Sequence, residues 1–192
     1  MGGTLQQIDN SIFLFFNGLH ASWADVFFYY ISSRFVWIPL YLLLAFFLFR
    51  RYRKKAWILL AAVVISVVFS DQSCNLIKHT VQRPRPSHET ELVDQVHLVA
   101  KPDGTLYKGG PYGFPSSHAA NAMALALIVV AFLTREKKWL TALVFCWVLL
   151  VSYSRIYLGV HYPSDIVVGW CVGALWSGFL ILLLRRTKLL KE

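Results

Sequence analysis

Long apolar stretches dominate this sequence and leave few folds open to it. Only 15% of the residues are charged, against about 25% in a typical globular domain. Four stretches have or approach the roughly 20 residues that a helix needs to cross a bilayer, at 56–77, 117–134, 139–155 and 163–184. A fifth, less regular stretch ends at Phe49, is apolar back to Phe35 and borrows residues from 24–33. We predict one all-α domain over residues 1–192, a polytopic transmembrane helical bundle with five spans.

The N-terminal residues carry a weaker apolar pattern. Between residues 4 and 19, large apolar side chains recur among Gln, Asp and Asn, which is typical of an amphipathic helix at the membrane interface. A sixth crossing by this segment is the alternative. The first ten residues lack the basic region of a cleaved signal peptide, so we expect them to belong to the mature protein.

Basic residues predict the orientation of the spans. Twelve of the nineteen Lys and Arg residues fall in three short segments that share one side if the chain crosses five times. Such an excess marks the cytoplasmic side. The net charge of +9 therefore reflects topology, and we expect no nucleic-acid partner. The segments are Arg50, Arg51, Arg53, Lys54 and Lys55; Arg135, Lys137 and Lys138; and Arg185, Arg186, Lys188 and Lys191.

The other side receives the N-terminal segment, the 78–116 connection and a turn near 156–162. The connection is too long for a simple link between antiparallel helices. Its Lys-Pro-Asp-Gly sequence at 101–104 predicts a small β-hairpin.

Four polar clusters emerge at that non-cytoplasmic face. Each has an ordinary explanation: cations at helix ends extend to the interface, Ser116 and Ser117 can cap a helix, and an acid in a first helical turn is favoured by the dipole. Arg155 is harder to explain in such ordinary terms, because Asp165 is the only acidic residue near it in the sequence. The clusters are Lys78 with Arg85; Pro115, Ser116, Ser117 and His118; Ser154 with Arg155; and His161 with Asp165.

Taken together, the clusters predict phosphoryl transfer. Three cations and a helix N-terminus facing one point can bind a phosphate. One imidazole can attack phosphorus while the other protonates the leaving oxygen, and Asp165 can orient the nucleophilic ring. Because the three cations neutralise the phosphate charge, this chemistry requires no metal and no cofactor.

The motifs resemble the three-part signature of the type 2 phosphatidic acid phosphatases, whose superfamily includes bacterial acid phosphatases and vanadium haloperoxidases. The matching blocks run from residue 78 to 165: Lys78-x6-Arg85-Pro86, Pro115-Ser116-Ser117-His118 and Ser154-Arg155-x5-His161-x3-Asp165.

The resemblance implies a role for each matching residue. His161 would form a phosphohistidine, Asp165 would orient it, and His118 would be the general acid and then the base. The phosphate would be bound by Lys78, Arg85, Arg155, Ser116 and the backbone around Ser117. The family usually has Gly where this chain has Ser117, which would cost roughly 1–2 kcal/mol if that position needed a positive φ.

Two further polar residues share a helix face with Lys78. Asp71 and Asn75 precede it at i, i+4 and i+7 spacing. An ionisable residue at this depth should face the bundle interior and have a partner. We expect Asp71 and Asn75 to position Lys78 or Arg155, and a purely structural hydrogen bond to a neighbouring span is the alternative.

A site at the lipid–water boundary predicts a membrane lipid with a phosphate headgroup as substrate. The family resemblance makes hydrolysis of undecaprenyl diphosphate to undecaprenyl phosphate the leading expectation, because this is a common role of short members. We expect the enzyme in a bacterial inner membrane, with the site facing the periplasm. Lipid A, phosphatidylglycerol phosphate and phosphatidic acid are alternatives. A transporter fits less well, because 122–133 and 142–151 carry no charge. A haloperoxidase fits less well because its known relatives are soluble. An inactive lipid-binding protein fits less well because each signature position for the nucleophile, the acid and anion binding is filled. The sequence predicts no oligomeric state.

Overall fold

The computed structural model describes residues 2–187 and consists of helices joined by short connections and one long loop. The prediction of an all-α fold is confirmed, and no strand forms among the described residues. The seven longer helices are α1 Gly2–Asn17, α2 Ser22–Ile31, α3 Ile38–Tyr52, α4 Ala56–Val81, α5 Ser117–Val129, α6 Lys138–Tyr157 and α7 Pro163–Arg186. The shorter turns are η1 Arg34–Trp37, η2 Arg53–Lys55, η3 Pro86–His88 and the π-helical η4 Val130–Thr134, which continues α5.

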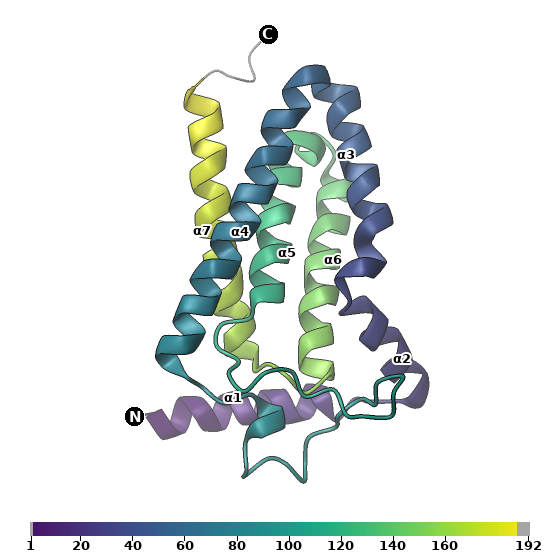
Figure 1. Ribbon diagram of the computed structural model, residues 1–192, viewed down its shortest axis with the longest axis vertical. Coiled ribbons are helices and arrows are strands. Elements are labelled where there is room, and N and C mark those ends of the chain that lie inside the picture. The colour runs from purple at the N-terminus through teal and green to yellow at the C-terminus, as the bar shows by residue number, and fades with distance from the viewer. Residues whose placement is uncertain (1, 188–192) are drawn as a thin grey trace.

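Four helical runs in the described chain have the length and apolar character of membrane spans: Arg34–Val81, Ser117–Thr134, Lys138–Tyr157 and Pro163–Arg186. The first run contains both α3 and α4, which turn back on each other at η2 (Figure 1). Arg53 has a φ of 51° at that turn. Residues 24–31, which the sequence assigned to this stretch, lie instead in the separate helix α2, and η1 separates that helix from α3. The number of crossings stays a prediction.

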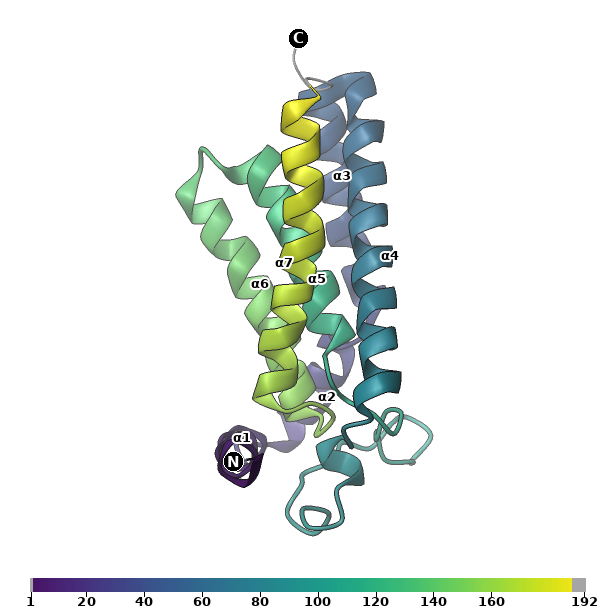
Figure 2. The same cartoon turned by 90° about the vertical axis from the view of Figure 1, so that its left-hand side faces the viewer.

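Helix α5 lies between α4, α6 and α7 and forms the centre of the bundle (Figures 1 and 2). Its backbone approaches α7 closely, because a Cβ added at Gly169 would lie 2.5 Å from the Ser116 carbonyl oxygen and one at Gly173 would lie 2.1 Å from that of Ala120. Small residues at such spacing are what membrane helices use for close packing. This contact fixes the start of α5 against the start of α7.

The two ends of the bundle differ as the charge pattern predicts. The α3–α4 turn, the α5–α6 connection and the end of α7 lie at one end, while α1, the 82–116 loop and the α6–α7 turn lie at the other (Figure 1). Arg51 and Glu136 form an ion pair of 3.0 Å at the basic end. Lys188 and Lys191 lie outside the described residues. An apolar cavity of about 770 Å³ opens between α3, α5 and α6, and none of the predicted site residues line it.

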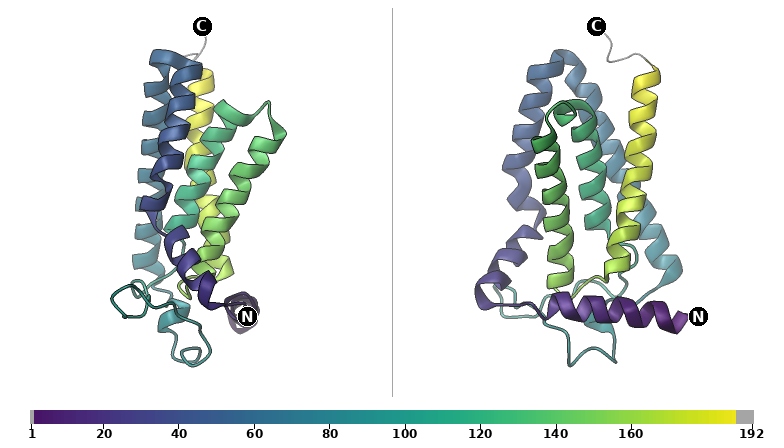
Figure 3. Two further views of the ribbon diagram at one scale, coloured as in Figure 1. Left: turned by 90° about the vertical axis from the view of Figure 1, so that its right-hand side faces the viewer. Right: turned by 180° about the vertical axis from the view of Figure 1, so that it is seen from behind.

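Helix α1 lies across the end of the bundle rather than along it (Figures 1 and 3). Phe13 points inward, is fully buried and contacts the Tyr162 ring edge-on at 5.5 Å. Leu5 and Phe15 point outward and are 74% and 64% exposed. This two-faced arrangement favours the interfacial helix over a sixth crossing.

The predicted hairpin forms as a single antiparallel bridge between Ala100 and Leu106. The Lys101 N–H donates to the Thr105 carbonyl at 2.8 Å, and Gly104 supplies the positive φ of the turn at 80°. The hairpin brings Tyr107 toward the end of the bundle where the polar clusters lie, as its hydrogen bond to Arg155 shows.

Candidate active site

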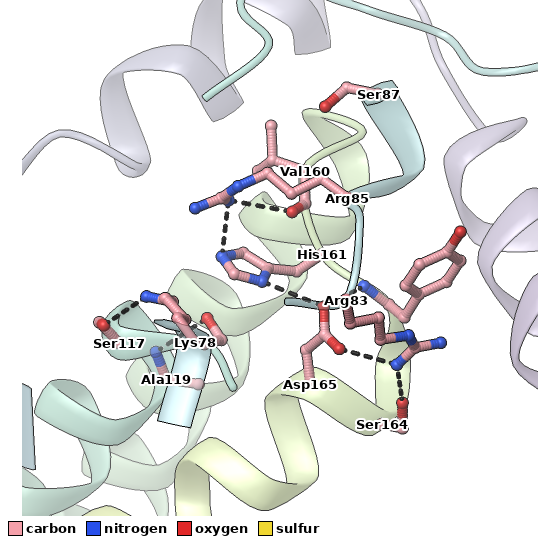
Figure 4. Close-up of polar contacts among 12 residues, drawn as sticks. Lys78, Arg83, Arg85, Ser87, Ser117, Ala119, Val160, His161, Ser164 and Asp165 are labelled. Carbon is pink, nitrogen blue, oxygen red and sulfur yellow. Dashed lines mark hydrogen bonds and ion pairs between the residues drawn. The ribbon is translucent and has the colours of Figure 1, made fainter. Parts of the chain in front are cut away.

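The structure brings the four polar clusters to one end of the bundle, although up to 87 positions separate them in the sequence. Figure 4 shows Lys78 and Ser117 on one side and Arg85, His161 and Asp165 on the other. Because α4 ends where α5 and α7 begin, the alternation of helix direction places all of these side chains at one face.

His161 and Asp165 form a buried pair at the start of α7. The imidazole Nδ1 lies 3.2 Å from the Asp165 Oδ2, and the Tyr162 N–H donates to the same oxygen at 3.0 Å. The Arg85 Nη1 lies 2.9 Å from the other ring nitrogen, Nε2. A guanidinium can only donate, so Nε2 accepts, Nδ1 carries the proton, and that proton is directed at the carboxylate. This tautomer leaves the lone pair of Nε2 on the side of the cations, as a nucleophile requires.

The surroundings keep His161 neutral. Burial lowers its pKa well below the ordinary value of 6.5, and the positive charges of Arg85, Arg155 and Lys78 lower it further. The imidazole is only 1% exposed. A neutral ring at physiological pH follows from both causes.

Three cations surround the ring, and two of them lack partners for part of their hydrogen-bonding capacity. Arg85 also donates to the Val160 carbonyl at 3.0 Å, yet its Nε is buried without a partner, and so is the Nε of Arg155. Burial and the charge of Arg155 lower the pKa of Arg85 to about 10, so it remains charged at neutral pH. Buried like charges with unsatisfied donors are costly unless an anion is bound between them. The arrangement therefore fits a phosphate.

Lys78 and Arg155 are held by hydroxyl groups from distant segments. The Lys78 Nζ donates to the Ser117 Oγ at 2.7 Å. Arg155 donates to the Ser32 Oγ and, at 3.2 Å, to the Tyr107 hydroxyl. Neither Ser32 nor Tyr107 was expected at the site, because nothing in their local sequence distinguishes them from loop residues.

The start of α5 supplies the predicted helix N-terminus. Ser116 is fully buried, and its Oγ accepts from the Ala119 N–H at 3.5 Å. Its hydroxyl therefore caps the helix, which is the ordinary structural role considered for this residue from the sequence. Ser117 is not among the non-glycine residues with positive φ. The expected cost of Ser in place of Gly is therefore absent. The N–H groups of Ser117 and His118 lie in the first helical turn, where they have no intrahelical acceptor.

His118 follows in that same turn and is partly buried. It is close enough to His161 for its charge to contribute to the lowered pKa of that ring. The role of His118 as the general acid stays a prediction.

Asp71 and Asn75 are paired with each other. The Asn75 Nδ2 donates to the Asp71 Oδ2 at 3.1 Å, and within residues 2–187 neither side chain has a hydrogen bond to Lys78 or Arg155. The expected role of this pair in positioning Lys78 or Arg155 stays a prediction.

Arg83 also lies at the site, although the motifs did not predict it. It stands between Lys78 and Arg85 in the first block. In the structure its guanidinium donates to Asp165 Oδ1 at 2.8 Å (Figure 4). The signal that could have found it is the one used for Arg155: a cation on the outer side that the positive-inside pattern does not explain.

Comparison with known proteins supports the resemblance. The profile of the PAP2 superfamily matches residues 55–188. Among curated proteins, the chain is 36% identical to a lipid A 4'-phosphatase of Bacteroides thetaiotaomicron, over 88% of this chain and 73% of that protein. It is 37% identical to a lipid A 4'-phosphatase of Porphyromonas gingivalis, over 90% and 71%. It is 32% identical to an undecaprenyl-diphosphatase of Sulfolobus acidocaldarius, over 84% and 69%.

Two crystal structures share the fold. Aquifex aeolicus LpxE superposes with a TM-score of 0.68 at 26% identity, covering 90% of this chain and 93% of that one. A PAP2-type phosphatidylglycerolphosphate phosphatase of Bacillus subtilis superposes with a TM-score of 0.67 at 22% identity, covering 96% and 87%. The arrangement of helices in this bundle is therefore the same as in these two crystal structures.

Proposed function

The chain belongs to the PAP2 superfamily and is an integral membrane hydrolase of lipid phosphate esters, and from that premise we propose that it removes the 4'-phosphate of lipid A. The observation that carries the chemistry is the buried His161, whose Nδ1 proton is directed at Asp165 and whose Nε2 faces Arg85. We place the reaction at the periplasmic face of a bacterial inner membrane.

In the proposed first step, the Nε2 lone pair of His161 attacks phosphorus. The N–P bond forms, the ester P–O bond breaks, and His118 gives its proton to the departing sugar oxygen. Asp165 stabilises the positive charge that develops on the His161 ring. In the second step His118 takes a proton from water, the water oxygen attacks phosphorus, and the N–P bond breaks to release inorganic phosphate.

The cations stabilise the charge on the equatorial oxygens of phosphorus in both steps. Arg85 donates to Nε2 in the free enzyme, and a bound phosphate oxygen would accept from that guanidinium instead. Lys78, Arg155 and the N–H groups at the start of α5 complete the set of donors. These groups supply the charge neutralisation, so we propose that hydrolysis proceeds without a metal.

The relatives favour lipid A over undecaprenyl diphosphate, which was the leading expectation from the sequence. The two relatives at 36% and 37% identity are both lipid A 4'-phosphatases, while the undecaprenyl-diphosphatase is 32% identical over a smaller share of the chain. The sequence motifs contain only the groups that bind phosphate, which both lipids carry, so the motifs could not separate the two.

The experiment is phosphate release from a panel of lipids in detergent with a chelator present. Lipid A, undecaprenyl diphosphate and phosphatidic acid are compared by kcat/KM, and mass spectrometry locates the phosphate lost from lipid A. We expect lipid A to be the best substrate and the 4'-phosphate to be lost. Preference for undecaprenyl diphosphate would overturn the substrate assignment alone, while an absence of release from every lipid would overturn the proposed activity.

The pH profile tests the role of His161. Burial and nearby positive charge lower the pKa of His161 below 6.5. The attacking ring must be neutral, so on the acid side activity should fall as the pH drops through that lowered value. His118 must be protonated, so kcat/KM should be bell-shaped overall. Arg85→Gln removes a positive charge that lowers the pKa of His161, so it should move the acid limb to higher pH.

The wild type is the control for this shift, measured on the same lipid. The phosphate monoester of the substrate also titrates at about pH 6. Comparing the two proteins on one substrate cancels its contribution to the pH profile. An acid limb that stayed in place or moved to lower pH in Arg85→Gln would contradict the assignment of His161 as the attacking base.

A further inference from the structure

Arg83 lies between two carboxylates that come from opposite ends of the sequence. Its Nη1 donates to Asp165 Oδ1 at 2.8 Å, and its Nη2 donates to Asp9 Oδ2 at 2.7 Å. The arginine side chain is 17% exposed, that of Asp9 is 9% exposed, and that of Asp165 is fully buried. The guanidinium also stacks on the Tyr162 ring, with its Cζ 4.0 Å from the ring centroid.

The two oxygens of Asp165 have separate partners. Oδ2 faces the His161 ring and accepts from the Tyr162 N–H, whereas Oδ1 accepts from Arg83. A carboxylate held at both oxygens has a fixed plane, and that plane determines the direction of its hydrogen bond to Nδ1 of His161. Arg83 is thus the group that sets the orientation of Asp165 from the side opposite the imidazole (Figure 4).

Asp9 connects the same arginine to the interfacial helix α1. Its Oδ1 accepts from the Ser164 N–H at 3.0 Å, in the first turn of α7. The Ser164 hydroxyl donates to Asp9 Oδ2 and accepts from Arg83 Nη1 at 2.7 Å. Gln6, one turn earlier on α1, accepts from Arg83 Nη2 at 2.9 Å. A carboxylate at the start of a helix is favoured by the free N–H groups there, so Asp9 both caps α7 and binds Arg83.

Helix α1 has anchors that do not involve Arg83. Phe13 is buried against Tyr162, and the Asn17 side chain donates to the Tyr157 carbonyl at 2.9 Å and accepts from the His97 N–H at 2.7 Å. Attachment of α1 alone would not require an arginine in a mostly buried position, where desolvation is costly. These anchors do not explain why contacts run without a break from Asp9 through Arg83 to Asp165.

We infer that Arg83 is a positioning residue for hydrolysis: it orients Asp165, and its bond to Asp9 makes the docked interfacial helix part of the active-site assembly. This inference rests on the proposed function, in which Asp165 orients the nucleophile. It assigns α1 a role in turnover, because displacement of α1 from the end of the bundle would release one side of the guanidinium.

The test compares Arg83→Gln and Arg83→Lys with the wild type on lipid A. Loss of a partner that orients a reacting group typically lowers activity about 10- to 100-fold, so we expect kcat to fall by that factor in Arg83→Gln while KM changes little. Arg83→Lys keeps the charge and should recover part of the loss. Arg135→Gln, an exposed arginine at the basic end, is the matched control and should behave as the wild type.

A double-mutant cycle distinguishes positioning from general stabilisation. If Arg83 acts through Asp165, Arg83→Gln should cause little further loss in an Asp165→Asn background. Asp9→Asn should lower kcat less than Arg83→Gln, and its effect should vanish once Arg83 is replaced. It also supplies a milder variant if Arg83→Gln does not fold. Thermal unfolding in detergent measures the stability of each protein.

Wild-type kcat in Arg83→Gln, or a full additional loss in the Asp165→Asn background, would overturn the inference. An Asp9→Asn variant with wild-type kcat would overturn the part that concerns α1. These results leave the proposed function standing as long as the wild type releases phosphate and the His161→Ala variant does not. Failure of the wild type to act on any lipid phosphate is a different outcome and concerns the proposed function itself.

Discussion

The His161→Ala variant is expected to lose phosphate release by a factor of roughly 10⁴ or more, the scale seen when a covalent nucleophile is removed. The reason is geometric, because Nε2 of this ring faces the phosphate-binding Arg85 while Nδ1 is bonded to Asp165. The measurement is release of radiolabelled phosphate from lipid A, together with label retained on the protein after quenching in alkali, where a phosphohistidine survives.

The His118→Ala variant is the control for this prediction. It retains His161, so it should still acquire label, slowly, and should discharge it more slowly still, because no base activates water. His161→Ala should acquire none. Substantial turnover in His161→Ala, or labelling at another residue, would show that a different group attacks phosphorus.

Gly173→Ala is expected to destabilise the protein by about 1–3 kcal/mol, the usual cost of overpacking. A Cβ at this position would lie 2.1 Å from the Ala120 carbonyl oxygen and 3.0 Å from its carbonyl carbon. Both atoms belong to the backbone, so no side chain can move aside and the two helices must separate. Thermal unfolding in detergent should show a Tm lower by several degrees, and activity should fall because Asp165 and Ser116 lie at the same helix pair.

Gly178→Ala provides the matched control, since it makes the same chemical change five positions along α7. No atom lies within 4 Å of a Cβ placed there. Its Tm should stay near that of the wild type or rise slightly, because alanine favours the helical backbone by about 0.5–1 kcal/mol relative to glycine. Equal losses in the two variants would mean that helix propensity, and not the close approach of α5 and α7, determines the effect.

The sequence predicted the bundle well because its signals are local. Apolar length and the positions of Lys and Arg depend only on the bilayer, and α4 to α7 begin and end close to the expected residues. The convergence of Lys78, Arg85 and His161 was predictable for a related reason: alternating helix direction places every second connection at one face.

The contacts that depend on tertiary placement were not predictable. Asp9 reaches Arg83 only because α1 lies across the end of the bundle, 74 positions away in the sequence. The orientation of an interfacial helix relative to a bundle depends on packing between the two, and the local pattern of apolar residues does not specify that packing. Asp71 and Asn75 bond each other within one helix at the i, i+4 spacing, and their expected role in positioning Lys78 or Arg155 stays a prediction.

The backbone contact between α5 and α7 has a consequence for how such an enzyme can change its substrate. The Ser116 N–H donates to the Asp165 carbonyl at 2.9 Å, and Gly169 and Gly173 leave no space between the helices. The distance between the groups proposed to attack phosphorus and to protonate the leaving oxygen is therefore set by main chain rather than by replaceable side chains. We expect new headgroups to be accommodated by changes in the 87–114 part of the loop, while the reacting pair keeps its spacing.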